Sequence, residues 1–131
     1  MKQIHLVFAC FLLFAGCAGV QNTESEINQK LDAKSDKEIV LVKVINDSRC
    51  PQGVQCIWAG EVIVEVAAYE NKELVEQATF TLNKDTKEEV KNWFTKHLPG
   101  RKENLKEIQV LPYPKEGIQI QPEDYRITLN Y

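Results

Sequence analysis

Two cysteines separated by five residues are the side chains in this sequence best suited to chemistry. Cys50 and Cys56 could form a disulfide, act as a redox pair or supply two thiolates to a metal. Redox pairs favour a tighter Cys-x-x-Cys at a helix start, whereas here the segment between the sulfurs is turn-like. Two thiols and the distant His97 make an incomplete zinc shell. A structural disulfide, worth roughly 2 kcal/mol, is the leading prediction.

Other candidates for catalysis are isolated in the sequence. His97 has no second histidine near it, and Ser48 lacks the neighbouring histidine that would activate it as a nucleophile. We therefore predict no catalytic residue, no metal and no cofactor. The expected class is a non-enzymatic protein.

The start of the chain resembles a secretory signal. One basic residue, Lys2, precedes an almost wholly apolar run from Ile4 to Phe14. As a helix this run would reach about 16 Å, which is too short for the ~30 Å of a membrane interior.

The next residues, Ala15-Gly16-Cys17, resemble the lipobox of bacterial lipoproteins, although Phe14 replaces the usual small aliphatic residue. The resemblance implies removal of residues 1–16 as a signal peptide and attachment of lipid, including palmitate, to Cys17. It implies a place in the cell envelope, with the outer membrane as the expected membrane. The alternative is a plain secretory signal. Cys10 would leave with residues 1–16, so Cys50 and Cys56 would remain as a self-contained pair in an oxidising compartment.

Composition limits the partners. The chain of 131 residues has a net charge of −3, and removal of Lys2 without any acidic residue would make it −4. This acidic balance argues against nucleic acid. We expect a single domain, a monomer, with contact to the membrane through its lipid and with an envelope protein or glycan as partner.

The remaining pattern predicts a tether followed by a mainly β domain. Residues 17–37 are polar and read as a lipidated flexible tether, and residues 38–131 read as one domain. Apolar β-branched residues at 39–45 predict a central strand, and alternation at 61–69 and 75–82 predicts a hairpin. Further strands are expected at 105–111, 118–121 and 125–131.

One helix interrupts these strands. Val90, Trp93, Phe94 and His97 recur at helical spacing within residues 85–98, and Asp85 or Thr86 with Glu89 resembles a capping box. The predicted fold is an antiparallel β-sandwich, immunoglobulin-like or barrel-like, with one short α-helix.

The segment Asp47-Ser48-Arg49-Cys50-Pro51, followed by Cys56-Ile57-Trp58-Ala59-Gly60, is the most distinctive. It resembles the DSRCP…CxWAG signature of a family of small, uncharacterised bacterial lipoproteins, as do residues 111–114 and 124–126. The resemblance covers about residues 38–131 and implies export, a disulfide and a β-rich domain. It implies no activity.

This segment allows two interpretations. In the first, it is a corner fixed by the disulfide, with Trp58 packed beside the sulfurs. In the second, it is a recognition loop that presents Arg49 and Gln52 outward, with Trp58 and Tyr113 completing the binding surface. The predicted function is a lipid-anchored binding or structural module. The alternatives are a peptidase-inhibitor-like sandwich presenting residues 49–57 and 112–117, and a thiol–disulfide protein using Cys50 and Cys56.

Overall fold

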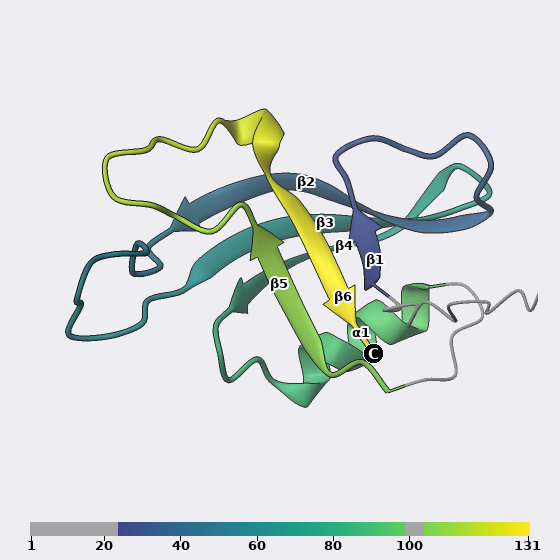
Figure 1. The fold of residues 1–131 in the computed structure, drawn as a ribbon. Coiled ribbons are helices and arrows are strands. Elements are labelled where there is room, and N and C mark those ends of the chain that lie inside the picture. Colours follow the sequence, from purple (N-terminus) through teal and green to yellow (C-terminus); the bar gives the residue numbers. More distant parts are fainter. Residues whose placement is uncertain (1–23, 99–103) are drawn as a thin grey trace, which may run out of the picture.

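The computed structural model describes residues 24–98 and 104–131, and the predicted signal peptide and Cys17 lie outside this part. Two three-stranded antiparallel sheets and one α-helix make up the fold (Figure 1). This confirms the predicted mainly β class and is consistent with a sandwich-like arrangement.

Sheet B contains β2 (Lys37–Asp47), β3 (Val62–Glu70) and β4 (Glu73–Leu82) in the order β2-β3-β4. The predicted hairpin is confirmed as β3 and β4, joined by a two-residue turn at Asn71 and Lys72 in which both residues have positive φ. The expectation of a central strand at 39–45 is wrong, because β2 is an edge strand and β3 is central.

The outer strand β2 contains two irregularities in its pairing with β3. The register skips Val42 and then Ile45, and both side chains are exposed. These bulges explain why a nearly continuous apolar run can lie at the edge of a sheet. They interrupt the ladder and make the edge a poor template for pairing with another chain.

Sheet A has the order β1-β6-β5 and is formed by β1 (Glu24–Ile27), β6 (Arg126–Asn130) and β5 (Glu107–Leu111). A 3-10 turn at Pro122–Asp124 precedes β6. The expectation of a flexible tether over 17–37 is wrong for residues 24–27, because β1 pairs with β6 and buries Ile27. A four-residue strand with one buried side chain gains its stability from a partner about a hundred residues later in the chain.

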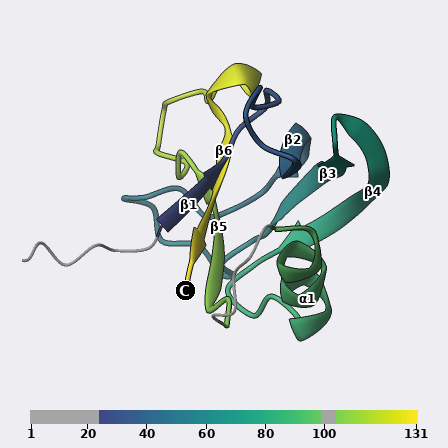
Figure 2. The ribbon, with the colours of Figure 1, turned by 90° about the vertical axis from the view of Figure 1, so that its right-hand side faces the viewer.

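The helix α1 (Glu88–His97) lies below sheet B and buries Val90 and Phe94 against it (Figure 2). The predicted capping box is not formed. The helix begins after Lys87 without a side-chain cap, and the Thr86 hydroxyl donates instead to the Asn83 carbonyl at 2.7 Å.

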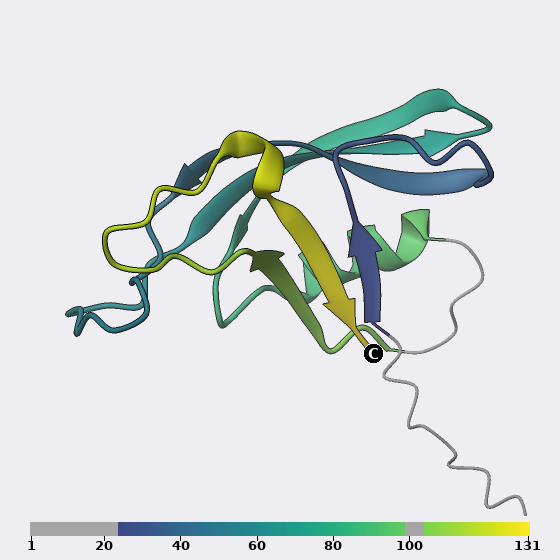
Figure 3. The ribbon, with the colours of Figure 1, turned by 45° about the horizontal axis from the view of Figure 1, so that its top comes forward.

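The core lies between the two sheets and α1, and the strands of sheet A cross those of sheet B (Figure 3). On one side of the sandwich the sheets are linked by the Leu41 N–H, which donates to the Asn28 carbonyl at 2.9 Å. The core includes residues from every strand: Ile27, Ile39, Leu41, Val62, Val64, Val66, Leu82, Ile108, Val110, Ile127 and Leu129.

Candidate functional site

The connection between β2 and β3 is a long loop whose base continues the strand pairing. The Ser48 N–H donates to the Glu61 carbonyl at 2.8 Å, and the Cys50 N–H donates to the Ala59 carbonyl at 2.9 Å. The Ser48 hydroxyl also donates to the Glu61 carbonyl at 3.0 Å. The two arms are therefore held together before the loop opens.

Gly60 allows this close approach of the two arms. Its φ is +74°, and a Cβ atom at this position would lie 2.0 Å from the Ser48 carbonyl oxygen. No other residue fits there without moving the backbone. Gly53, in the tip of the same loop, also has a positive φ of +86° but has open space around it.

The predicted disulfide between Cys50 and Cys56 is confirmed, with the Cα atoms 5.9 Å apart. It closes the loop just beyond the backbone pairing of Cys50 with Ala59. The tip, residues 51–58, is thereby fixed at Cys50 by both a backbone hydrogen bond and the disulfide. Such a loop loses little conformational freedom when it binds.

Asp47 and Arg49 form a largely buried ion pair beneath this loop. Arg49 Nε donates to Asp47 Oδ1 at 2.8 Å and Arg49 Nη2 donates to Oδ2 at 2.6 Å, a two-point contact. Each of the two side chains is only 9% exposed. An arginine makes this planar contact with a carboxylate better than a lysine could.

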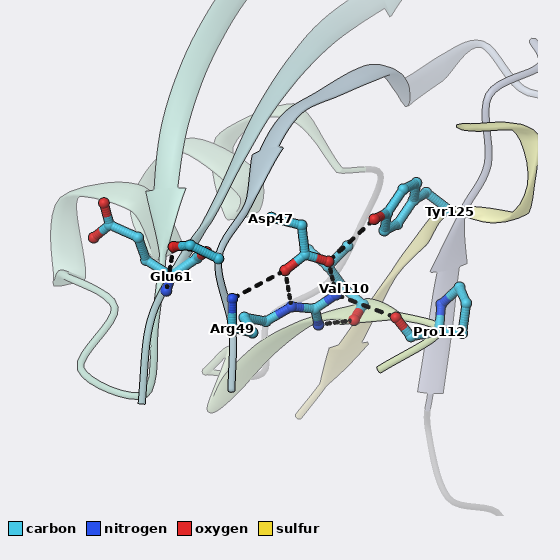
Figure 4. Close-up of polar contacts among 7 residues, drawn as sticks. Asp47, Arg49, Glu61, Val110, Pro112 and Tyr125 are labelled. Atoms are coloured by element: carbon cyan, nitrogen blue, oxygen red, sulfur yellow. Dashed lines mark hydrogen bonds and ion pairs between the residues drawn. The ribbon is translucent and has the colours of Figure 1, made fainter. Parts of the chain in front are cut away.

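The same two residues join the sheets. Arg49 donates to the carbonyls of Val110 and Pro112, and the Tyr125 hydroxyl donates to Asp47 Oδ2 at 3.1 Å (Figure 4). Asp47 ends β2 in sheet B, whereas the other partners belong to β5 of sheet A and to the loops beside it. We call Asp47, Arg49 and Tyr125 the Asp47 cluster.

Electrostatics in this cluster favour an ionised Asp47 and a protonated Tyr125. Burial alone would raise the pKa of Asp47, but the hydrogen bonds and positive charge of Arg49 outweigh it, so the pKa lies below its ordinary value of 3.8. Burial, together with the nearby Asp47 charge, raises the pKa of Tyr125 above 10.0. Asp47 therefore stays an acceptor and Tyr125 stays a donor at neutral pH.

A second loop, residues 112–118, packs beside the first. The Gln52 N–H donates to the Pro114 carbonyl at 2.9 Å, and Gln52 forms an isolated β-bridge with Lys115. The ring of Tyr113 covers the guanidinium of Arg49, with 4.9 Å from the ring centroid to Cζ. Both loops lie at the left of Figure 1, beyond the end of β2. We call residues 50–58 and 112–118 together the loop end.

The first loop of the loop end exposes large apolar side chains. Ile57 is 106% exposed and Trp58 is 62% exposed, and no residue from 50 to 60 carries a charge. Contiguous exposed apolar patches on proteins often mark interaction sites. Smaller contributions come from three further exposed residues, Val54, Tyr113 and Ile118.

The predicted binding residues therefore have different roles. Gln52 and Trp58 are exposed at the loop end and Tyr113 is adjacent, but Arg49 is buried and points inward, not outward. The expectation that Trp58 packs beside the disulfide is wrong. It lies beyond the ring that the disulfide closes and is exposed to solvent, and the packed tryptophan is Trp93 of α1.

Sequence reasoning missed Ile57 as a surface residue and Tyr125 as a partner of Asp47. A signal for Ile57 existed in its position directly after Cys56, in a segment that carries no charge from residue 50 to residue 60. Nothing local could indicate Tyr125, since it lies 78 positions from Asp47.

A groove of about 380 Å³ adjoins the loop end. One wall of the groove is β5. The opposite wall is formed by Ala59 and Gly60, which precede β3, and by Asn83 and Lys84, which follow β4. Val62 and Leu82 line its floor.

A separate polar cluster fixes α1 to β4. Glu76 accepts hydrogen bonds from Trp93 Nε1 at 2.9 Å and from Lys96 Nζ at 3.1 Å, and it lies 2.9 Å from Nε2 of His97. The Trp93, Lys96 and His97 contacts lower the pKa of Glu76 to about 2. His97 thus has a structural partner in the strand that its helix covers.

Residues 24–98 and 104–131 contain no group of three or more histidine, cysteine, aspartate or glutamate side chains placed to hold a metal ion. In the same part of the chain no helix has the length and apolar character to cross a membrane.

Comparisons with protein-family models, with curated proteins and with solved structures gave no match to this chain. The lipobox and the DSRCP…CxWAG resemblance therefore stay predictions from the sequence. The site has to be interpreted from its own geometry.

Proposed function

We propose that this protein is a lipid-anchored module of the cell envelope that binds a partner, without catalysis, through its loop end. The observation that carries the proposal is the exposure of Ile57 and Trp58 on a loop closed by a disulfide. Large apolar side chains presented on a preorganised scaffold are typical of the central residues of protein–protein interfaces.

The rigidity of the loop supports this proposal. The Asp47 cluster, the Ser48 and Cys50 backbone bonds and the disulfide hold the tip without using any of its apolar side chains. Because the tip is not needed for the core, its composition points to a role outside the fold. Trp58 in particular offers a large rigid contact surface with one polar N–H.

The proposed anchor fits the position of the loop end. Lipid on Cys17 would be joined to β1, which begins at Glu24, by a short segment that spans at most about 25 Å. Of the three strands of sheet A, β1 lies farthest from the loop end (Figures 1 and 3). An anchor on this side would leave the loop end directed away from the lipid, toward an envelope protein or glycan, with the outer membrane as the proposed location.

A competition assay tests the proposal. Labelled protein made without residues 1–17, and therefore without lipid, is added to envelopes from cells that lack the chain. We expect saturable binding that excess unlabelled protein displaces, whereas the Ile57→Ser, Trp58→Ser double variant displaces at least about tenfold less well.

The matched control is the Leu74→Ser, Val75→Ser double variant. These residues are also about half exposed, at 54% and 52%, but lie next to the β3–β4 turn at the opposite end of sheet B. This variant should compete as the unchanged protein does. If the Ile57 and Trp58 variant competes equally well, the loop end is not the binding surface.

A second candidate function is that of a peptidase-inhibitor-like module. The hydrogen bond between Gln52 and Pro114 joins the two loops into one protruding edge, as an inhibitor entering a cleft would require. Slow, tight inhibition of an envelope peptidase that the Ile57 and Trp58 variant abolishes would favour it. Rapid cleavage of the chain between residues 51 and 58 would exclude it.

A further inference from the structure

The free edge of β5 runs along the groove next to the loop end. Sheet A has the order β1-β6-β5, so β5 is paired on one side only, and all five of its residues line the groove. In Figure 1, β5 lies beside the region where β3 begins and β4 ends. The groove therefore has a strand edge as one wall and loop residues as the other.

The position of Arg49 indicates that backbone groups of β5 point into this groove. The Val110 carbonyl accepts a hydrogen bond from Arg49, and Arg49 itself lines the groove. In an antiparallel strand, alternate residues direct both backbone groups to the same side. The N–H and C=O of Ile108 and the N–H of Val110 therefore also face the groove.

The chemistry of the groove suits an uncharged extended peptide. Its floor is formed by the core side chains of Val62 and Leu82, which an apolar side chain could contact. Lys84 and Glu107 contribute one charge of each sign, and Arg49 is neutralised by Asp47. A neutral groove does not attract a polyanion such as nucleic acid or an acidic glycan.

We propose that this groove binds an extended segment of a partner polypeptide, which adds a fourth strand to sheet A along β5. The segment makes backbone hydrogen bonds to Ile108 and Val110 and directs alternate apolar side chains toward Val62 and Leu82. This inference goes beyond the proposed role of the loop end and does not depend on it, because Ile57 and Trp58 do not line the groove.

Arg49 limits where the segment can pair. Its guanidinium already occupies the carbonyls of Val110 and Pro112, so the paired stretch ends at Val110. At the other end, Lys84 and Glu107 flank the groove and can contact polar residues of the segment. The expected recognition sequence is therefore short, with alternating apolar residues.

A library of linear peptides displayed on phage, selected against the immobilised full chain in detergent, is the probe. We expect selected peptides to have alternating apolar residues. N-methylation of the residues that face β5 should weaken binding at least tenfold, and N-methylation of the residues between them should not. Bound peptide should slow hydrogen exchange at the amides of Ile108 and Val110 and leave Gln109, which pairs with Thr128, unchanged.

Matched variants locate the site. Ala59→Trp fills the groove from its rim and should abolish peptide binding, whereas Ala33→Trp, at an exposed position in the loop between β1 and β2, should not. The Ile57→Ser, Trp58→Ser variant should bind peptide normally, so failure of the groove and failure of the loop end are distinguishable.

Three outcomes would overturn the proposal. In the first, no selected peptide binds the unchanged chain better than the Ala59→Trp variant. In the second, both series of N-methylated peptides bind equally well. In the third, concentrated chain alone protects the Ile108 and Val110 amides from exchange. The last result would assign the edge to a second copy of this protein instead of a partner peptide.

Discussion

The base and the tip of the loop between β2 and β3 have opposite compositions and opposite environments. At the base, the charged residues Asp47 and Arg49 are buried, whereas at the tip the apolar residues Ile57 and Trp58 are in solvent. Folding alone would favour the reverse arrangement. The base has a structural explanation in the contacts between the sheets, and the tip has none, which is why we assign stability to one and recognition to the other.

The largest expected effect is at the base. Arg49→Met leaves the Asp47 carboxylate buried without its partner, which should lower the free energy of unfolding by about 3–5 kcal/mol. Urea denaturation followed by circular dichroism measures it. Tyr125→Phe, which removes a single hydrogen bond to the same carboxylate, should cost only about 1 kcal/mol. An Arg49→Met protein as stable as the unchanged chain would contradict the assignment of stability to the base.

Alanine substitutions at two glycines of the same loop, Gly60 at the base and Gly53 in the tip, compare the two regions directly. Gly53→Ala meets no atom within 4 Å and should cost only the strain of a left-handed alanine, about 1–2 kcal/mol. Gly60→Ala adds a collision with the Ser48 carbonyl and should cost clearly more. The two denaturation midpoints measure the difference, and equal midpoints would show that the arms can separate without loss.

The disulfide lies between base and tip and should have an intermediate effect. The Cys50→Ser, Cys56→Ser variant should fold with a loss of about 2 kcal/mol, because only a short loop is released. A structural bond should have a reduction potential below about −300 mV, measured by equilibration with a thiol buffer. A value near −200 mV would instead support the thiol–disulfide alternative.

Acid titration compares the base of the loop with the polar cluster around Glu76, which joins α1 to β4. The pKa of Glu76 is about 2 in the folded chain against 4.5 for the ordinary group, so its contribution is complete above pH 4.5 and is lost as the pH falls toward 2. Trp93 fluorescence, measured in a Trp58→Phe background, should change over this range. Glu76→Gln in the same background should reduce the change, and an unaltered titration would show that another group causes it.

The smallest expected effect on stability is at the tip. The Ile57→Ser, Trp58→Ser variant should unfold within about 0.5 kcal/mol of the unchanged protein, because neither side chain is part of the core. The same denaturation experiment measures it. A loss above 2 kcal/mol would mean that the tip contributes to the fold, and the contrast with the base would fail.

The sequence alone was sufficient for elements whose pattern is local. Alternation at Val62, Val64 and Val66 predicted β3, and the spacing of Val90 and Phe94 predicted the buried face of α1. The turn-like segment between Cys50 and Cys56 favoured a structural disulfide over a redox pair. In each case the residues that decide the structure lie within a few positions of one another.

Features that depend on distant partners could not be predicted. β1 has one buried side chain and requires β6, and the burial of Arg49 requires carbonyls 61 and 63 positions away. Trp58 was misplaced for a related reason. Its residue type favours a core, but the loop around it offers no second layer of side chains to cover the ring.

The closure of the loop at its base also bears on how this protein can change over time. The backbone bonds of Ser48 and Cys50 and the disulfide define the ends of the segment 51–58 independently of the side chains between them. The sequence of this segment, which includes Ile57 and Trp58, can therefore change without redesign of the scaffold. The surface that we propose binds a partner can be diversified by mutation or by engineering while the sandwich stays the same.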